Sequence, residues 1–162
     1  MPTSKAQQLI DDYAGNTWLI ERHVEGLSHE ESVLQPPFPA NCLNWVLGHI
    51  ISRRNSALQL LSAVPIWPEE VTNRYRSGSD PIKNAGEARE LPALLQDLAQ
   101  TQARIAQALE EAPPEKLNEV VETDRGTKPV WGHLAGLHWH ETYPTGQLDI
   151  LRAMALAQRE WT

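Results

Sequence analysis

Four stretches of this chain carry apolar residues at steps of three and four, which is the pattern of an amphipathic helix. They cover about residues 4–27, 42–64, 91–112 and 130 onward. Helices of this length must bury their apolar stripes against one another, and long links separate several of them. The pattern therefore predicts an all-α fold, a four-helix bundle with long crossover connections, that spans residues 1–162 as a single domain.

The predicted helix boundaries follow from local signals. Asn41 is a plausible N-cap for the second helix, Pro65 ends that helix, and Pro92 suits the first turn of the third. Residues 65–90 lack sustained periodicity, and connections of such length are often functional. The segment VVETDRGTKPV predicts a short extended excursion that turns at residues 124–126, so little strand is expected elsewhere.

Composition excludes several partners. The chain has 14 Lys and Arg against 21 Asp and Glu, a net charge of −7, so its overall charge does not attract nucleic acid or anionic lipid. No stretch approaches the roughly 20 apolar residues of a membrane span. The single cysteine, Cys42, cannot form an intrachain disulfide, and the first residues lack the apolar core of a secretory signal. We expect a cytoplasmic protein.

Histidines provide the candidate site, and helical geometry limits which of them can meet. His133 and His140 share a helix face but lie about 10.5 Å apart along the axis, too far for one ion. His138 and His140 point about 200° apart on a regular helix. Periodicity alone therefore predicts no more than one candidate histidine per helix.

Two motifs resemble the DinB/YfiT-like superfamily of four-helix-bundle proteins. The stretch LNWVLGHI contains Trp45 and His49, and HETYPTGQLDILR begins at His140 and contains Gly146 and Gln147. That superfamily typically carries a three-histidine site for a divalent metal, with one histidine in W-x-x-x-H and two in H-x-x-x-H before x-G-Q. Its third histidine is replaced here.

The resemblance implies a divalent-metal-dependent transferase that uses a low-molecular-weight thiol on a small electrophilic substrate. In that scheme His49 and His140 hold the metal, most readily Ni or Zn, and the ion binds the thiol and lowers its pKa. Tyr143 or Gln147 orients substrate or water. A homodimer is also expected. Cys42 is a poor nucleophile, because only a helix start would lower its pKa.

Pro144 stands where the third histidine would be. Two imidazoles leave a divalent ion short of the three protein ligands usual in an open site, unless Glu141 or His138 substitutes. Proline also removes a backbone hydrogen bond to His140, so the helix either kinks there or breaks and restarts at Thr145. The alternative is a metal-free family member that serves as a small-molecule binding or dimeric interaction module.

Other residues have both functional and structural interpretations. Trp67 and residues 74–76 of the long link could line a pocket or bind an anionic group, and a solvated loop is the competing interpretation. Trp45, Trp131 and Trp139 are as consistent with core as with pocket lining.

Overall fold

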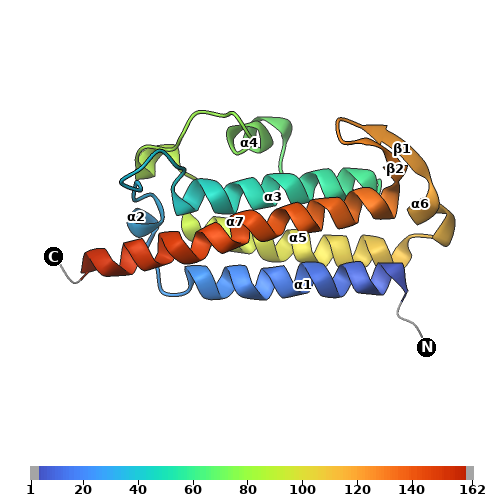
Figure 1. Ribbon diagram of the computed structural model, residues 1–162, viewed down its shortest axis with the longest axis horizontal. Coiled ribbons are helices and arrows are strands. Elements are labelled where there is room, and N and C mark those ends of the chain that lie inside the picture. Colours follow the sequence, from blue (N-terminus) through green and yellow to red (C-terminus); the bar gives the residue numbers. More distant parts are fainter. Residues whose placement is uncertain (1–3, 160–162) are drawn as a thin grey trace.

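Four long helices form the body of the protein in the computed structural model, which describes residues 4–159. They are α1 (Lys5–Val24), α3 (Leu43–Leu60), α5 (Leu91–Glu111) and α7 (Val130–Arg159). α7 packs between α1 and α3, and α5 packs against the same two helices, so α5 and α7 lie diagonally opposite (Figure 1). The predicted all-α bundle is confirmed.

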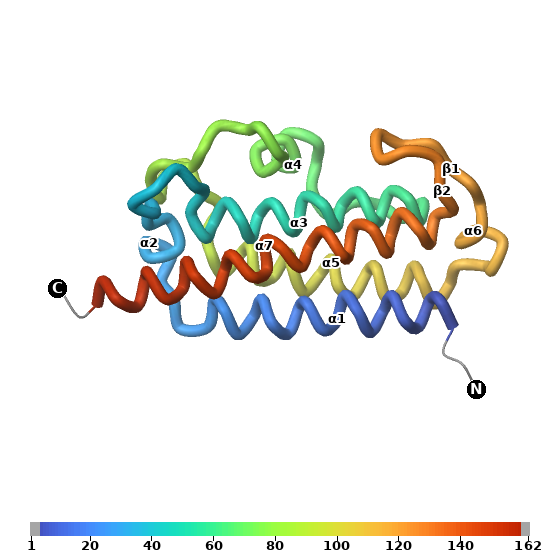
Figure 2. Tube along the Cα trace, viewed as in Figure 1, coloured from blue at the N-terminus to red at the C-terminus, as the bar shows by residue number. Residues whose placement is uncertain are grey.

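The links explain this arrangement. α1 and α3 are joined through α2 (His29–Ser32), and α3 and α5 run parallel because the 61–90 link crosses back along the bundle, as the trace in Figure 2 shows. That link contains α4 (Glu69–Arg74) and a 3-10 turn, η1 (Ala85–Glu87). α5 leads to α7 through α6 (Pro114–Asn118) and a β-hairpin.

The hairpin is the predicted extended excursion. β1 (Val120–Thr123) pairs antiparallel with β2 (Gly126–Pro129), with Thr123 opposite Gly126. Gly126 has φ +91°, a left-handed conformation that glycine adopts without steric cost. The hairpin and α4 lie over the same side of α3, at different positions along it (Figure 1).

Local signals predicted some helix ends correctly and others wrongly. The second long helix, α3, ends at Leu60 rather than at Pro65. The third long helix starts at Leu91 with Pro92 in its first turn. The prediction for Asn41 was wrong, because Cys42 is the N-cap of α3 and makes no side-chain capping bond. α1 begins at Lys5, where the Ser4 hydroxyl accepts from the Gln7 amide, and ends at Val24, three residues earlier than periodicity suggested.

α3 is buried around most of its circumference, which positions the site. Its apolar residues contribute to both core clusters, each of which also contains residues of α1, α5 and α7, and one of which includes residues of the long link. Gly48 lies where Tyr75 of the long link crosses α3, and a Cβ at this position would come within 2.1 Å of the Tyr75 ring. The glycine is required because it lets the link lie directly on the helix.

α7 continues without interruption past Pro144. Pro144 is buried within the helix, and the neighbouring Thr145 hydroxyl donates to the Glu141 carbonyl at 2.8 Å. The predicted restart at Thr145 is therefore wrong. Packing of α7 against α1 and α3 along its length compensates for the missing backbone hydrogen bond.

No helix among residues 4–159 is long and apolar enough to cross a membrane.

Candidate functional site

His49 and His140 meet between α3 and α7. Their ring centroids lie 5.9 Å apart, with the ring planes inclined at 58°. His138 points the other way, and its ring contacts Tyr13 of α1 edge-on at 5.5 Å. Helical geometry thus predicted correctly that only one of His138 and His140 faces the partner helix.

His49 is held in one orientation from two sides. Its Nδ1 lies 2.8 Å from the Tyr75 carbonyl, and its ring stacks on Trp45 one turn earlier, with centroids 5.1 Å apart. A carbonyl oxygen can only accept, so Nδ1 carries the proton and Nε2 retains its lone pair. His49 therefore presents a basic nitrogen at Nε2.

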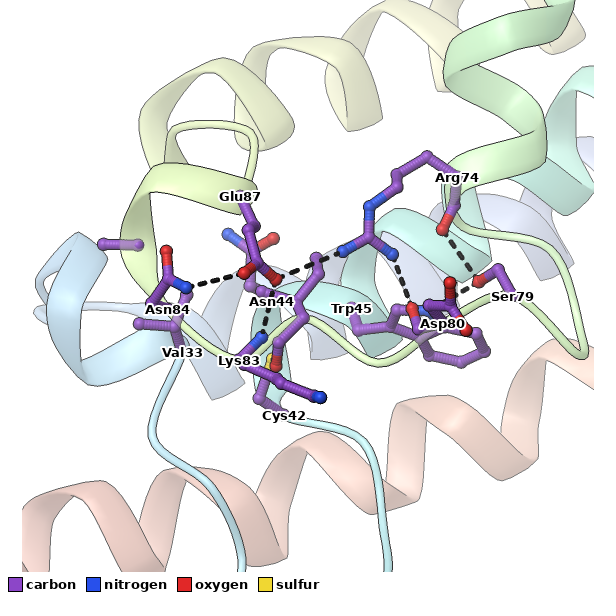
Figure 3. Close-up of polar contacts among 12 residues, drawn as sticks. Val33, Cys42, Asn44, Trp45, Arg74, Ser79, Asp80, Lys83, Asn84 and Glu87 are labelled. Carbon is purple, nitrogen blue, oxygen red and sulfur yellow. Dashed lines mark hydrogen bonds and ion pairs between the residues drawn. The ribbon is translucent and has the colours of Figure 1, made fainter.

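The long link fixes the Trp45 side of the site. The Trp45 indole N–H donates to Ser79 at 3.0 Å, and the Ser79 hydroxyl donates to the Arg74 carbonyl at 2.8 Å. Figure 3 shows the Arg74 guanidinium between Asp80 and Glu87, where it donates to the Asp80 carbonyl. Arg74 is thus bound within the link, which is ordered structure rather than a solvated loop.

Trp67, the other link residue considered for a pocket, is part of the core. It is buried, and its indole N–H donates to the Asp97 carboxylate at 2.8 Å. Trp139 is neither core nor pocket lining, because 62% of it is exposed.

His140 has an unsatisfied ring nitrogen. Its Nδ1 is buried and has no hydrogen-bond partner within the described chain, and the same is true of Nε of Arg53, one turn after His49 on α3. A buried polar nitrogen without a partner costs free energy of about 1–3 kcal/mol. Each of the two nitrogens is therefore available to a water molecule or a bound ligand.

The electrostatics of the pair favour neutral imidazoles. Burial lowers the pKa of His49, and the charges of Arg53 and Arg125 lower it further. Burial also lowers the pKa of His140, followed by the charges of Arg125 and Arg53, while Glu141 opposes the shift. Both rings therefore act as hydrogen-bond acceptors at neutral pH.

Glu141 is occupied elsewhere. Its carboxylate forms a bidentate pair with Arg54, at 2.6 and 3.0 Å, and both side chains are buried. Arg54 also donates to the Thr17 hydroxyl at 2.9 Å. Glu141 therefore joins α7 to α3 and α1 and does not turn toward the histidines.

These residues do not fit a metal centre with three protein ligands. Residues 4–159 contain no group of three or more His, Cys, Asp or Glu side chains arranged to hold an ion. His138 faces Tyr13, Glu141 pairs with Arg54, and a proline side chain cannot coordinate. Arg53 and Arg125 add positive charge, which opposes a cation.

Tyr143 and Gln147 lie farther along α7, toward solvent. Tyr143 is 59% exposed and contacts Trp139 edge-on, and Gln147 borders a shallow hollow beside Phe38 and Val46. No hydrogen bond or ring contact within the described residues joins either side chain to His49 or His140.

Sequence reasoning missed the two arginines of this region. Arg53 follows His49 by four residues, so helical spacing could have placed it on the same face. Arg125 was noted only as part of a turn, because nothing local in the sequence indicates that the hairpin folds back over α3. The sequence left Glu141 open as a possible metal ligand. Its actual partner, Arg54, is too distant in the chain for a local pattern to reveal the pair.

The fold and the family model that the chain matches define a DinB/YfiT-like four-helix-bundle protein. Within that class, the chain belongs to the family described as the mycothiol maleylpyruvate isomerase N-terminal domain, which matches residues 19–143. The match includes both histidines and ends just before Pro144.

A solved structure supports the same fold. The chain is similar to a protein described as a conserved protein of a locus from Enterococcus faecalis, with 15% identity and a TM-score of 0.74 over 96% of this chain and 99% of the other. No curated protein matches the chain.

Proposed function

We propose that this chain binds a small thiol-bearing molecule between α3 and α7, and that His49 and His140 contact it directly without a three-ligand metal centre. The pairing of two imidazoles that face each other carries the proposal, because each offers a nitrogen able to accept a proton. The family is named for an enzyme that uses mycothiol, which suggests the class of ligand.

The local charges support a thiol. A thiolate is stabilised beside cationic side chains, and Arg53 and Arg125 both act on the two rings. A neutral imidazole accepts the thiol proton, and the guanidinium charges then stabilise the sulfur anion. In this scheme the chain itself supplies both the proton acceptor, an imidazole, and the positive charges that stabilise the thiolate.

Calorimetric titration of tag-free protein with mycothiol, in buffer that contains a chelator, tests the proposal. We expect saturable binding that His49→Ala and His140→Ala each weaken about tenfold, or ~1.4 kcal/mol. His23→Ala is the matched control, since His23 lies on α1 and pairs with Asp149. Absence of binding in chelator, or equal losses in all three variants, would overturn the proposal.

A metal-dependent thiol transferase that uses Ni or Zn is the second candidate. One observation favours it: the His49 and His140 rings are close enough for one ion to reach a nitrogen of each, at roughly 2.0–2.1 Å per bond. Under this candidate, tag-free protein holds near-stoichiometric metal and loses it on His49→Ala. Tyr143 and Gln147 would then orient substrate from the solvent side of α7.

Pro144→His separates a degenerate metal site from a remodelled one. If only the third ligand has been lost, this variant takes up added Zn²⁺ or Ni²⁺ markedly more tightly than the native protein. No gain in affinity would mean that the surroundings, including Arg53 and Arg125, have changed for another purpose.

We also propose a homodimer through the outward face of α7. Apolar or small residues recur along it at alternating steps of three and four, and its large side chains are mostly exposed. They are Gly136, Trp139, Tyr143, Gly146, Ile150, Ala153 and Ala157. This spacing is that of a helix-pairing seam, in which large side chains of one helix fit beside small ones of the other. A cytoplasmic location remains the sequence-based prediction.

A further inference from the structure

A pocket next to the histidine pair shares Arg53 and Arg125 with the proposed thiol site. It has a volume of about 380 Å³ and lies between α3 and the first turns of α7, with the hairpin turn over it. Arg53, Ser56 and Gln59 come from α3, and residues 123–125 come from the hairpin. A volume of this size suits a small molecule.

The charge of this pocket is opposite in sign to that of the whole protein. Its lining contains two guanidinium groups, from Arg53 and Arg125, and one carboxylate, from Asp124. Neither arginine forms an ion pair with any acidic side chain among residues 4–159. Asp124 offsets part of this charge, because it acts on Arg53, but the lining keeps an excess of positive charge in a chain of net charge −7. Such a pocket favours an anion.

The two guanidinium groups act on each other across the pocket. Burial is the largest cause that lowers the pKa of Arg53, and the charge of Arg125 is the next. Nε of Arg53 is also buried without a hydrogen-bond partner. An anion between the two groups would remove their repulsion and accept from the unsatisfied N–H.

The rest of the lining supplies neutral partners and apolar walls. Ser56 and Gln59 offer a hydroxyl and an amide, and Leu60 and Leu137 are apolar. Thr123 holds the hairpin turn in place, because its hydroxyl accepts from the Arg125 backbone amide at 3.1 Å. A guanidinium group pairs with a carboxylate or phosphate through two parallel hydrogen bonds, which a planar oxyanion fits best.

We propose that this pocket binds a small molecule through a carboxylate or phosphate group, with Arg53 and Arg125 as the two cationic contacts. The pocket adjoins the histidine pair and shares its two arginines, but binding of an oxyanion here requires neither a thiol nor a metal. A molecule anchored here by its oxyanion would extend toward His140, which lies about two turns of α7 beyond His133 in the pocket wall.

Titration of metal-free protein with inorganic phosphate and with succinate, without any thiol, tests the proposal. We expect saturable binding by calorimetry for at least one of the two anions and none for uncharged succinamide. Arg53→Gln and Arg125→Gln should each weaken binding tenfold or more. Preference for phosphate or for succinate identifies the source of the oxyanion.

Lys128→Gln is the matched control, because it removes a positive charge from the same hairpin outside the pocket. Equal loss in all three variants would show unspecific attraction and overturn the proposal, as would binding that persists unchanged without Arg53 or Arg125. A second measurement needs no variant: the Nε–H resonance of Arg53 in the native protein should shift on addition of the anion. No shift at saturating concentration would also contradict the proposal.

Discussion

Gly48 shows how one residue positions the site. The glycine admits the Tyr75 ring against α3, and the Tyr75 carbonyl then accepts from His49. The Tyr75 hydroxyl also accepts a hydrogen bond from the Arg89 backbone amide at 2.9 Å. Tyr75 is therefore held through both its backbone and its side chain. The orientation of His49 therefore depends on the absence of a side chain one position earlier.

We predict that Gly48→Ala destabilises the protein by about 1–3 kcal/mol, since the added methyl group overlaps the Tyr75 ring. Urea unfolding measures the change. Gly15→Ala, at an exposed position of α1, is the control, because no atom lies within 4 Å of the added Cβ, and it should stabilise the protein by about 1 kcal/mol. Equal effects in the two variants would contradict the packing role of Gly48.

Cys42 is placed for structure rather than for reaction. Its side chain is buried, and burial raises the pKa of its thiol. A raised pKa leaves little thiolate at pH 8, so we predict that iodoacetamide labels native protein slowly and urea-unfolded protein completely. Mass spectrometry follows the modification. Rapid labelling of the native protein would restore Cys42 as a candidate nucleophile.

At the scale of elements, a buried ion pair holds three helices together. Arg54 of α3 pairs with Glu141 of α7 and donates to the Tyr13 carbonyl and Thr17 hydroxyl of α1. This network satisfies the charges of both groups. It also explains why a glutamate next to His140 takes no part in the candidate site.

We predict that Arg54→Met costs about 3–5 kcal/mol of unfolding free energy, because it leaves the Glu141 carboxylate buried without a partner. Arg54→Met combined with Glu141→Leu should recover most of that loss. Thermal and urea unfolding of both variants provide the measurement. A double variant as unstable as the single one would show that the hydrogen bonds to α1, rather than the charge pair, carry the stability.

The helix containing Pro144 shows the limit of local rules. Proline disfavours a helix interior by about 3 kcal/mol, yet α7 continues because α1 and α3 pack along both of its sides. The local sequence around Pro144 predicts a kink or a break in the helix. Long-range packing decides that the helix persists.

At the scale of the whole molecule, the outward seam of α7 is the surface that a second copy would cover. We predict that Ile150→Arg converts a dimer into a monomer, because Ile150 is a 63% exposed apolar side chain within the seam. Sedimentation equilibrium measures the mass. Gln107→Arg on the exposed side of α5 serves as the control and should leave the mass unchanged. A monomer in the unmodified protein would contradict the proposed dimer.

The sequence by itself determined the helices, their order and the long links, because apolar periodicity and proline placement act within a few residues. It also determined that His138 and His140 face apart, since helical geometry is local. Only the tertiary structure decided that Arg54 forms an ion pair with Glu141 and that the Tyr75 carbonyl binds His49. It also decided that the hairpin brings Arg125 toward Arg53. These pairings join residues far apart in the chain, and their energies depend on burial and charge that exist only once the bundle has formed.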